Sequence, residues 1–297
     1  MTDVLIKEES DRTAVAGGVR PAREEVVSAR PRRRFGRAVV PTLAVTVLLV
    51  IVLWALFPSL FAHQDPFDGV TAEKFQGPSA RHLFGTDNLG RDIFSRTVHG
   101  TRSSLLTAVI AVAIALVAGS LLGLTGGYFR GAIDAVIGRF TDALLAVPSF
   151  LLAMVVVTSL GFSTTNAAIA TGISAVAIFA RLMRSEVLRV TSLNYVESSR
   201  LVGCGPLTVL FVHVLPNVYR SVIALAVLQF GMALIVIAGL AYLGYGNPPP
   251  APDWGILVSD GKNYMDRHWW IVFFPGLVII VTCLSLNRAS RLLAVTR

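Results

Sequence analysis

The chain has 297 residues, of which 54% are hydrophobic and 15% charged, with a mean hydropathy of +0.67 and a formal net charge of +8. Soluble domains carry about a quarter charged residues, so this composition excludes a soluble globular protein and indicates an integral membrane protein. The two cysteines, Cys204 and Cys283, are too few for a disulfide framework, and we expect neither to face an oxidising compartment.

The first 37 residues are polar and charged without hydrophobic periodicity, which predicts a disordered tail. The basic run RPRRR at 30–34 precedes an apolar stretch, so we interpret it as a flank that orients the chain in the membrane rather than as a nucleic-acid site. The apolar stretch that follows has about 25 residues and is therefore too long for the core of a signal peptide. It predicts a membrane helix.

Apolar runs long enough to cross a bilayer predict an all-α integral membrane protein with six transmembrane helices. The predicted spans are 38–62, 103–125, 143–161, 165–180, 218–246 and 269–287. They make up a membrane domain of residues 38–288, with external loops 63–101 and 247–268, a cytoplasmic loop 184–217 and a cytoplasmic tail 289–297.

The distribution of basic residues predicts the orientation. With the N-terminus inside, 19 Lys and Arg fall in segments on the inner side and 6 in segments on the outer side, with Arg102 at a boundary. Positive charge is enriched in cytoplasmic loops, so we expect both termini to be cytoplasmic.

The first external loop ends in HLFGTDNLGRDIFSRTVHGTRSSL, residues 82–105. Its glycines permit tight turns, and we expect Arg91 to hydrogen-bond to Asp87 and Asp92, which gives an ordered cap before the second span. The oxygen-ligand pattern of a calcium loop is missing, so no metal site is expected. Contact with an external partner is the alternative role of this cap. The residues assigned to it are Gly85, Asp87, Gly90, Arg91, Asp92 and Arg96.

Few residues within the spans are diagnostic. Gly119 and Gly123 are four residues apart, a spacing that permits close helix contact. Pro148 and Pro275 predict kinks in the third and sixth helices. Gln229 is the clear amide in a span, which makes it a candidate residue of a translocation path.

Ionisable and aromatic residues near the membrane surface suggest structural roles. Arg139 and Asp142 are interpreted as a local ion pair rather than a proton relay. The loop NPPPAPDWG, residues 247–255, should be stiffened by its prolines. Four aromatic side chains are expected to form an interfacial belt: Trp254, Tyr264, Trp269 and Trp270.

The stretch NYVESSRLVGCGPLTVLFVHVLPN, residues 194–217, is broken into pieces too short to span. Asn194 and Glu197 have the spacing of a capping box, so a short helix should begin there, and Gly203 and Gly205 should end it. Pro206 suits the start of a second short helix, which should end near Val212. Pro216 should then force Leu215 out of helical geometry before the fifth span. A pair of short helices is therefore predicted on the cytoplasmic face.

The chain shows no catalytic or cofactor signature. Its lysines, Lys7, Lys74 and Lys262, do not lie in a phosphate-binding glycine-rich loop, and the five histidines are scattered without ligand spacing. We expect a non-enzymatic chain without a cofactor or metal of its own and without a nucleic-acid partner.

The motifs together resemble a known family. The spacing from Glu197 through Gly203 to His213 and Pro216 is similar to the EAA loop of ABC-importer permeases, with serines in place of the two alanines. The segments 82–105, 179–203 and 240–255 resemble the C-type subunit of dipeptide, oligopeptide and nickel permeases, and the resemblance runs from about residue 38 to 288. The ending RASRLLAVTR departs from the acidic terminus of that family.

This resemblance implies a type I ABC-importer permease fold in a bacterial inner or plasma membrane. It implies three partners: a homologous B-type permease, one fused or two separate cytoplasmic ATPases that carry ATP and Mg, and an extracytoplasmic solute-binding protein. The residues implied to couple to the ATPase are Asn194, Tyr195, Glu197, Ser198, Ser199, Gly203, Pro206, His213, Leu215 and Pro216. The expected substrates are dipeptides or oligopeptides. Nickel or another small solute is the alternative within the family, and an ATP-independent secondary transporter is the alternative outside it.

Overall fold

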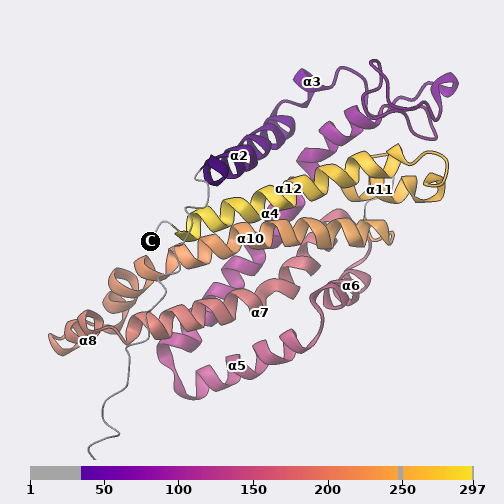
Figure 1. Cartoon of the computed structure of the whole chain (residues 1–297). Coiled ribbons are helices and arrows are strands. Elements are labelled where there is room, and N and C mark those ends of the chain that lie inside the picture. Colours follow the sequence, from indigo (N-terminus) through magenta and orange to yellow (C-terminus); the bar gives the residue numbers. More distant parts are fainter. Residues whose placement is uncertain (1–34, 247–249, 296–297) are drawn as a thin grey trace, which may run out of the picture. The chain divides into compact units, whose positions relative to one another are not determined.

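The computed structural model describes residues 35–246 and 250–295. All regular structure in these residues is helical, apart from an isolated bridge between Thr86 and Asp92. In chain order (Figure 1) the elements are α2 (Phe35–Leu56), α3 (Pro58–Phe61), η1 (Thr71–Glu73), α4 (Ile93–Phe129), α5 (Gly131–Ala146), α6 (Ser149–Leu160), α7 (Thr164–Thr191), α8 (Asn194–Leu201), α9 (Pro206–Thr208), η2 (Val209–Val214), α10 (Leu215–Tyr242), α11 (Trp254–Gly261), η3 (Lys262–Tyr264) and α12 (Trp270–Val295). Most of the predicted N-terminal tail and the first three residues of the proline-rich loop lie outside the described residues.

Four helical stretches are long and apolar enough to cross a membrane: Ile93–Phe129, Thr164–Thr191, Pro206–Tyr242 and Trp270–Arg291. Helices α5 and α6 meet the same criterion only as a pair, and α2 contributes a shorter apolar stretch, Pro41–Leu56. The described residues therefore hold four candidate spans, or five if the bent pair is one span. The prediction of a multi-pass helical membrane protein is confirmed at this level.

The third predicted span differs most from a simple helix. Helices α5 and α6 are bent by 93° where Val147 and Pro148 interrupt the helix. A residue before proline is disfavoured in helical geometry, and Val147 is extended, at φ −93° and ψ 128°. Pro148 therefore breaks the helix, which sharpens the predicted kink. The 12 residues of α6 reach about 18 Å, too short to cross alone.

Helices α7 and α12 continue past the ends of their predicted spans. Helix α7 continues past residue 180 to Thr191 and so takes up the first part of the predicted loop 184–217. Helix α12 runs to Val295, through most of the predicted tail 289–297.

Helices α4 and α7 form the most extensive helix pair of the unit that comprises residues 38–297. A β-carbon on Gly119 would lie 2.5 Å from the Val176 carbonyl oxygen, and one on Gly123 would lie 2.7 Å from the β-carbon of Met183. Because these distances leave no room for a side chain, the two glycines allow the helix backbones to approach closely. The predicted close contact is confirmed, and Gly127 continues the same row against α7.

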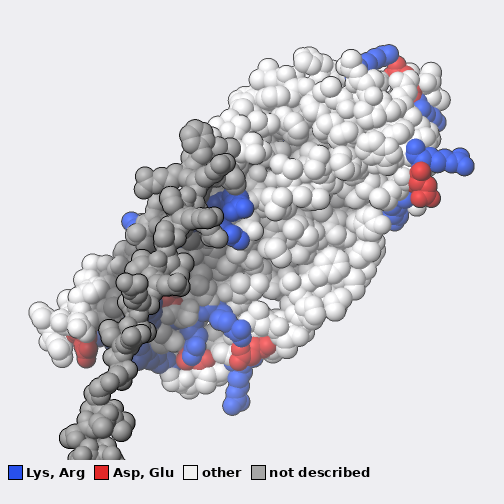
Figure 2. Space-filling view, in the orientation of Figure 1, with Lys and Arg blue, Asp and Glu red and all other residues white. Residues whose placement is uncertain are grey.

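Charged side chains occupy the two ends of the face in Figure 2, and a wide belt of uncharged residues separates them. Large apolar residues on several helices are exposed in this chain, among them Leu49, Val117, Val155, Ile235 and Ile280. An apolar exposed belt between charged ends is what a bilayer requires of a spanning protein.

Helix α11 packs against the beginning of α4. Its first residue, Trp254, was expected to belong to an interfacial aromatic belt, and the structure shows otherwise. Trp254 is only 1% exposed, and its indole Nε1 donates to the Thr97 carbonyl at 3.0 Å, so it is a core residue and not part of an aromatic belt. Ser104 donates to Asp253 at 3.0 Å and accepts from the Trp254 amide at 3.1 Å. Burial raises the pKa of Asp253, and hydrogen bonds from Gly255 and Ser104 oppose that rise.

Candidate functional site

Residues 192–214 connect α7 to α10 at one end of the bundle (Figure 1), and we call this segment the tip loop. It contains α8 and the helical residues that begin at Pro206. Gly203 ends α8 as predicted. Its φ is +93°, its amide donates to the Arg200 carbonyl at 3.0 Å, and the Cys204 amide donates to the Ser199 carbonyl at 3.1 Å. This pair of hydrogen bonds is the Schellman motif, which needs a left-handed residue at the position of Gly203.

The predicted capping box is wrong. The N-cap of α8 is Leu193, without a side-chain cap hydrogen bond, and Asn194 is already the first helical residue. The Leu193 carbonyl instead accepts hydrogen bonds from the Val196 and Glu197 amides, at 2.9 and 3.2 Å. The exposed Glu197 side chain is therefore not needed to start this helix.

The second half of the tip loop also differs from its prediction. Residues from Pro206 to Tyr242 form one continuous helix, and Leu215 is helical at φ −56° and ψ −43°. The turn before Pro216 is a π-helix, η2, in which the Leu215 amide donates to the Leu210 carbonyl. A proline ring clashes with the carbonyl four residues earlier in an α-helix, and the wider turn relieves that clash.

Buried residues attach the tip loop to the bundle. Val196, Val209 and Val214 are fully buried in one apolar cluster with residues of α7 and α10. The Tyr128 hydroxyl, near the end of α4, donates a hydrogen bond to the Pro206 carbonyl at 2.6 Å. The Tyr195 and His213 rings pack edge to face, with their centroids 6.1 Å apart. Two of the predicted coupling residues, Tyr195 and His213, are thus brought together.

Apolar side chains cover the outer surface of the tip loop. Leu201 is 83% exposed and Val202 86%, more than any other large apolar residues among those described. Leu207, Phe211 and Val212 are also exposed. An apolar patch on a rigidly anchored loop is typical of a surface that binds another protein.

The cap segment (residues 63–92) precedes α4 at the opposite end of the bundle. Asp87 accepts hydrogen bonds from the Leu89 and Arg91 amides, at 2.8 and 2.9 Å, and from Arg91 Nε at 2.7 Å. Gly90 has φ +78°, and a β-carbon there would overlap the Val70 carbonyl oxygen. The predicted turns at Gly85 and Gly90 and the pairing of Asp87 with Arg91 are confirmed.

Asp92 has other partners than the predicted Arg91. It caps α4 by accepting from the Ser95 amide at 2.7 Å, and it lies 2.9 Å from Nδ1 of the buried His82. Arg96 is fully buried, donates to the Pro66 carbonyl at 3.2 Å, and has the carboxylates of Asp87 and Asp260 at 4.0 and 3.9 Å. All six residues assigned to the cap are buried, so they form its framework.

Replacement of Arg91 by alanine is expected to lower the amount of assembled protein in the membrane at least severalfold. Asp87 would lose its closer ion-pair partner while staying buried and would keep only Arg96 at 4.0 Å, and breaking a buried pair typically costs about 3 to 5 kcal/mol. The measurement is the yield of detergent-solubilised protein by size-exclusion chromatography. Arg81→Ala is the control, since Arg81 pairs with Glu73 from an exposed position. Equal yields for the two variants would contradict a structural role for Arg91.

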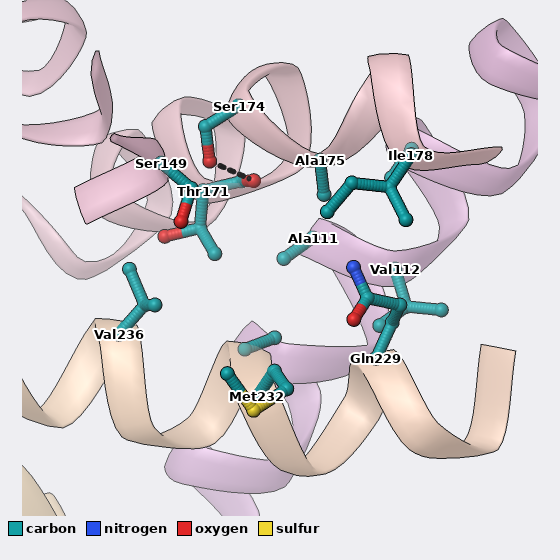
Figure 3. A pocket seen from close by; sticks show the side chains of 12 residues that line it. Ala111, Val112, Ser149, Thr171, Ser174, Ala175, Ile178, Gln229, Met232 and Val236 are labelled. Carbon is teal, nitrogen blue, oxygen red and sulfur yellow. Dashed lines mark hydrogen bonds between the residues drawn. The ribbon is translucent and has the colours of Figure 1, made fainter. Parts of the chain in front are cut away.

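A pocket lies among α4, α6, α7 and α10, near the middle of the spans (Figure 3). Its volume is about 60 Å³, enough for a few water molecules or a small polar group. Gln229 of α10 faces it, as expected for a candidate path residue, and the hydroxyls of Ser149 and Thr171 lie at the other end. Sequence reasoning missed both of these residues, since isolated hydroxyls are common in membrane helices.

Ion pairs hold α5 against α7. Asp134 accepts two hydrogen bonds from Arg184, at 2.5 and 2.6 Å, and Asp142 accepts one from Arg181 at 2.8 Å. The predicted pair of Asp142 with Arg139 is therefore wrong. Asp142 in α5 pairs instead with Arg181 in α7.

Comparison with protein families finds one match. The family described as binding-protein-dependent transport system inner membrane component matches residues 115–295. The chain is 40% identical over 246 residues to a di/tripeptide transport system permease protein DppC of Pseudomonas aeruginosa, with 81% of each chain covered. It is 38% identical to a glutathione transport system permease protein GsiD of Pectobacterium atrosepticum, with 86% of this chain and 85% of the relative covered.

Two solved structures have a similar fold. A chain of the MetNI methionine ABC transporter in an inward-facing conformation aligns with a TM-score of 0.57 and 16% identity, over 68% of this chain and 97% of that chain. A chain of an amino acid ABC transporter aligns with a TM-score of 0.53 and 15% identity, over 66% of this chain and 92% of that chain.

Proposed function

The chain belongs to the family of binding-protein-dependent transport system inner membrane components, the permease subunits of ABC importers, and we propose that it forms half of a membrane pathway for short peptides. The observation that carries the substrate class is the similarity to relatives named for di/tripeptide, dipeptide and glutathione transport, over more than 80% of both chains. The hydroxyl and amide groups of the membrane pocket suit a peptide. A nickel permease of the same family and an ATP-independent secondary transporter are the alternatives.

The tip loop is the proposed docking site for a cytoplasmic ATPase that binds ATP and Mg. Its exposed apolar residues offer a contact surface, and its buried valines link that surface to α7 and α10. Motion of the ATPase would therefore reach two spanning helices through a packed joint. The proposed coupling residues from Asn194 to His213 lie in this loop, and Leu215 and Pro216 are the first two residues of α10.

The cap segment is the proposed contact for an extracytoplasmic solute-binding protein. Its buried ion pairs hold the loop rigid, so the contact itself would be made by its exposed residues, among them Phe67, Val70, Leu83 and Leu89. A homologous B-type permease would supply the other half of the pathway.

The proposed experiment is affinity purification of the chain in mild detergent, followed by reconstitution with the solute-binding protein that co-purifies. We expect co-purification of an ATPase and a second permease, and ATP-dependent uptake of a dipeptide. A chain that transports without any ATPase would support the secondary transporter. ATP-dependent uptake of nickel but not of dipeptides would support the nickel permease.

We further propose six spans, formed by α2, α4, the α5–α6 pair, α7, α10 and α12, with both termini cytoplasmic. The orientation can be checked with single cysteines. These are introduced into a variant in which Cys204 and Cys283 are replaced by serine. Val70→Cys should react with a membrane-impermeant maleimide in intact cells, and Arg200→Cys only after permeabilisation, since both positions are exposed and lie at opposite ends of the bundle. Labelling of Arg200→Cys in intact cells would contradict this orientation.

A further inference from the structure

The membrane pocket is lined by one buried polar group without a hydrogen-bond partner among the described residues, the Thr171 hydroxyl. Thr171 belongs to α7 and is 3% exposed. A buried hydroxyl left unpaired costs about 1 to 3 kcal/mol, so such groups are normally satisfied by protein, water or a ligand. Figure 3 shows the Thr171 side chain beside that of Ser149 at one end of the pocket.

The beginning of α6 lies at the same end. Ser149, which lines the pocket, is the first residue of this 12-residue helix, and its N-cap is Pro148, without a side-chain cap hydrogen bond. The first amides of a helix have no intrahelical acceptors, and the helix dipole gives this end a partial positive charge. Three kinds of donor therefore meet here: uncapped amides, the Ser149 hydroxyl and the Thr171 hydroxyl.

The rest of the pocket also has features of a ligand site. Gln229 faces it from α10 and has no side-chain hydrogen bond within the described part of the chain. Most other lining residues are apolar, with Ala111, Ala115 and Val236 among them. Ser149 and Met232 are exposed in this chain, so the pocket opens on the side of the bundle. The few polar groups of this pocket, among them Ser149 and Gln229, would then face lipid, which is disfavoured, so a second chain is expected to cover this side.

We propose that this pocket binds the carboxylate of a peptide during transport, at the beginning of α6 and the Thr171 hydroxyl. Gln229 then binds the neighbouring peptide group with its amide. The cavity in this chain is small, and the part of the substrate that we place in it is the carboxylate end. The inference rests on the proposed peptide transport and adds the part of the substrate that the membrane chain recognises.

The test compares dialanine with dialanine amide in liposomes that contain the complete transporter. Each peptide is supplied on the solute-binding protein at equal occupancy, and uptake is measured with radiolabel. Thr171→Val removes the hydroxyl at nearly constant volume, Thr171→Ser keeps it, and Thr282→Val removes a buried hydroxyl that bonds to its own helix in α12. Ser149→Asp places a carboxylate at the start of α6, and Ser149→Asn is its neutral control.

Thr171→Val and Ser149→Asp should each lower dialanine uptake about tenfold and leave dialanine amide uptake within about twofold of wild type. Thr171→Ser and Thr282→Val should resemble wild type for both peptides, and Ser149→Asn, which loses the hydroxyl without adding a charge, should lower dialanine uptake less than Ser149→Asp. Wild-type uptake of dialanine by Thr171→Val and Ser149→Asp would overturn the proposal, as would equal losses for the two peptides. Absence of peptide uptake by the wild-type transporter would instead refute the proposed function, and this inference with it.

Discussion

Replacement of Gly123 by alanine is expected to reduce the yield of folded protein by at least about tenfold. The added β-carbon would overlap the Ala180 carbonyl oxygen, and it would lie 2.7 Å from the Met183 β-carbon and 2.9 Å from the Arg184 amide nitrogen. These are backbone or β-carbon atoms, so no side-chain rotation can relieve the contact. Helices α4 and α7 would have to move apart along the main packing interface of the bundle.

The matched control is Gly138→Ala, which changes the same residue type inside helix α5. A β-carbon at Gly138 meets nothing within 4 Å, and alanine is favoured over glycine in a helix by about 1 kcal/mol. Both variants are compared by the size-exclusion profile and thermal stability of the solubilised protein. Gly138→Ala should match or exceed wild type. Similar stability for Gly123→Ala would show that the α4–α7 contact is not as close as described.

The membrane class and most spans of this fold could be predicted, because a bilayer selects for apolar length, a property that a single sequence displays directly. The ends of the spans were predicted less well. Asp92 caps α4 eleven residues before the apolar run at 103 begins, and α7 and α12 continue past their apolar parts as ordinary helices. Hydropathy reports the thickness of the membrane and not the length of the helix.

The local structure of the candidate sites was predicted best where one residue determines it. Gly203 and Gly90 have positive φ, which glycine alone adopts readily; Gly90 was predicted to form a turn and Gly203 to end a helix. The capping box at Asn194 failed because the Leu193 carbonyl had already begun the helix. The helix also continues through Pro216, since a π turn absorbs the proline. The start of α8 and the helix through Pro216 both depend on which backbone hydrogen bonds form. The spacing of residue types does not show which of the alternative bonds is more stable.

The pocket could not be predicted because its residues come from four helices. Thr171 and Ser149 are 22 residues apart, and α6 packs against α7 so that both residues line the pocket. The helix break at Pro148 was expected, but the packing of α6 was not. A single hydroxyl in a span carries no signal until its neighbours are known.

Replacement of Gly203 by valine is expected to abolish uptake while the protein stays in the membrane. Gly203 has φ +93°, where a β-branched residue is strained by about 1 to 3 kcal/mol, and it is the left-handed residue of the Schellman motif that ends α8. No atom lies within 4 Å of a β-carbon placed there, so the strain is in the backbone and not in packing. The expected result is a displaced tip loop on an intact bundle.

Two further substitutions separate backbone strain from a change of surface. Gly205 lies two residues away with φ −62° and has only the Thr208 hydroxyl, at 4.0 Å, near its β-carbon position. Gly205→Val should therefore adopt the wild-type conformation and keep most of its uptake. Gly203→Asn should fall between wild type and Gly203→Val, because asparagine tolerates positive φ better than branched residues do.

The deciding measurement is ATP hydrolysis by the purified complex, with and without loaded solute-binding protein, beside uptake by the same preparation. If the tip loop joins the ATPase to α7 and α10, Gly203→Val should lose either the bound ATPase or the stimulation by substrate, while the affinity of the solute-binding protein for its peptide is unchanged. A strained loop that served only to anchor the bundle at the membrane surface would lower the thermal stability of the complex and leave stimulation intact. Wild-type stimulation and uptake in Gly203→Val would therefore refute the coupling role, because the exposed apolar tip would have moved without consequence for transport.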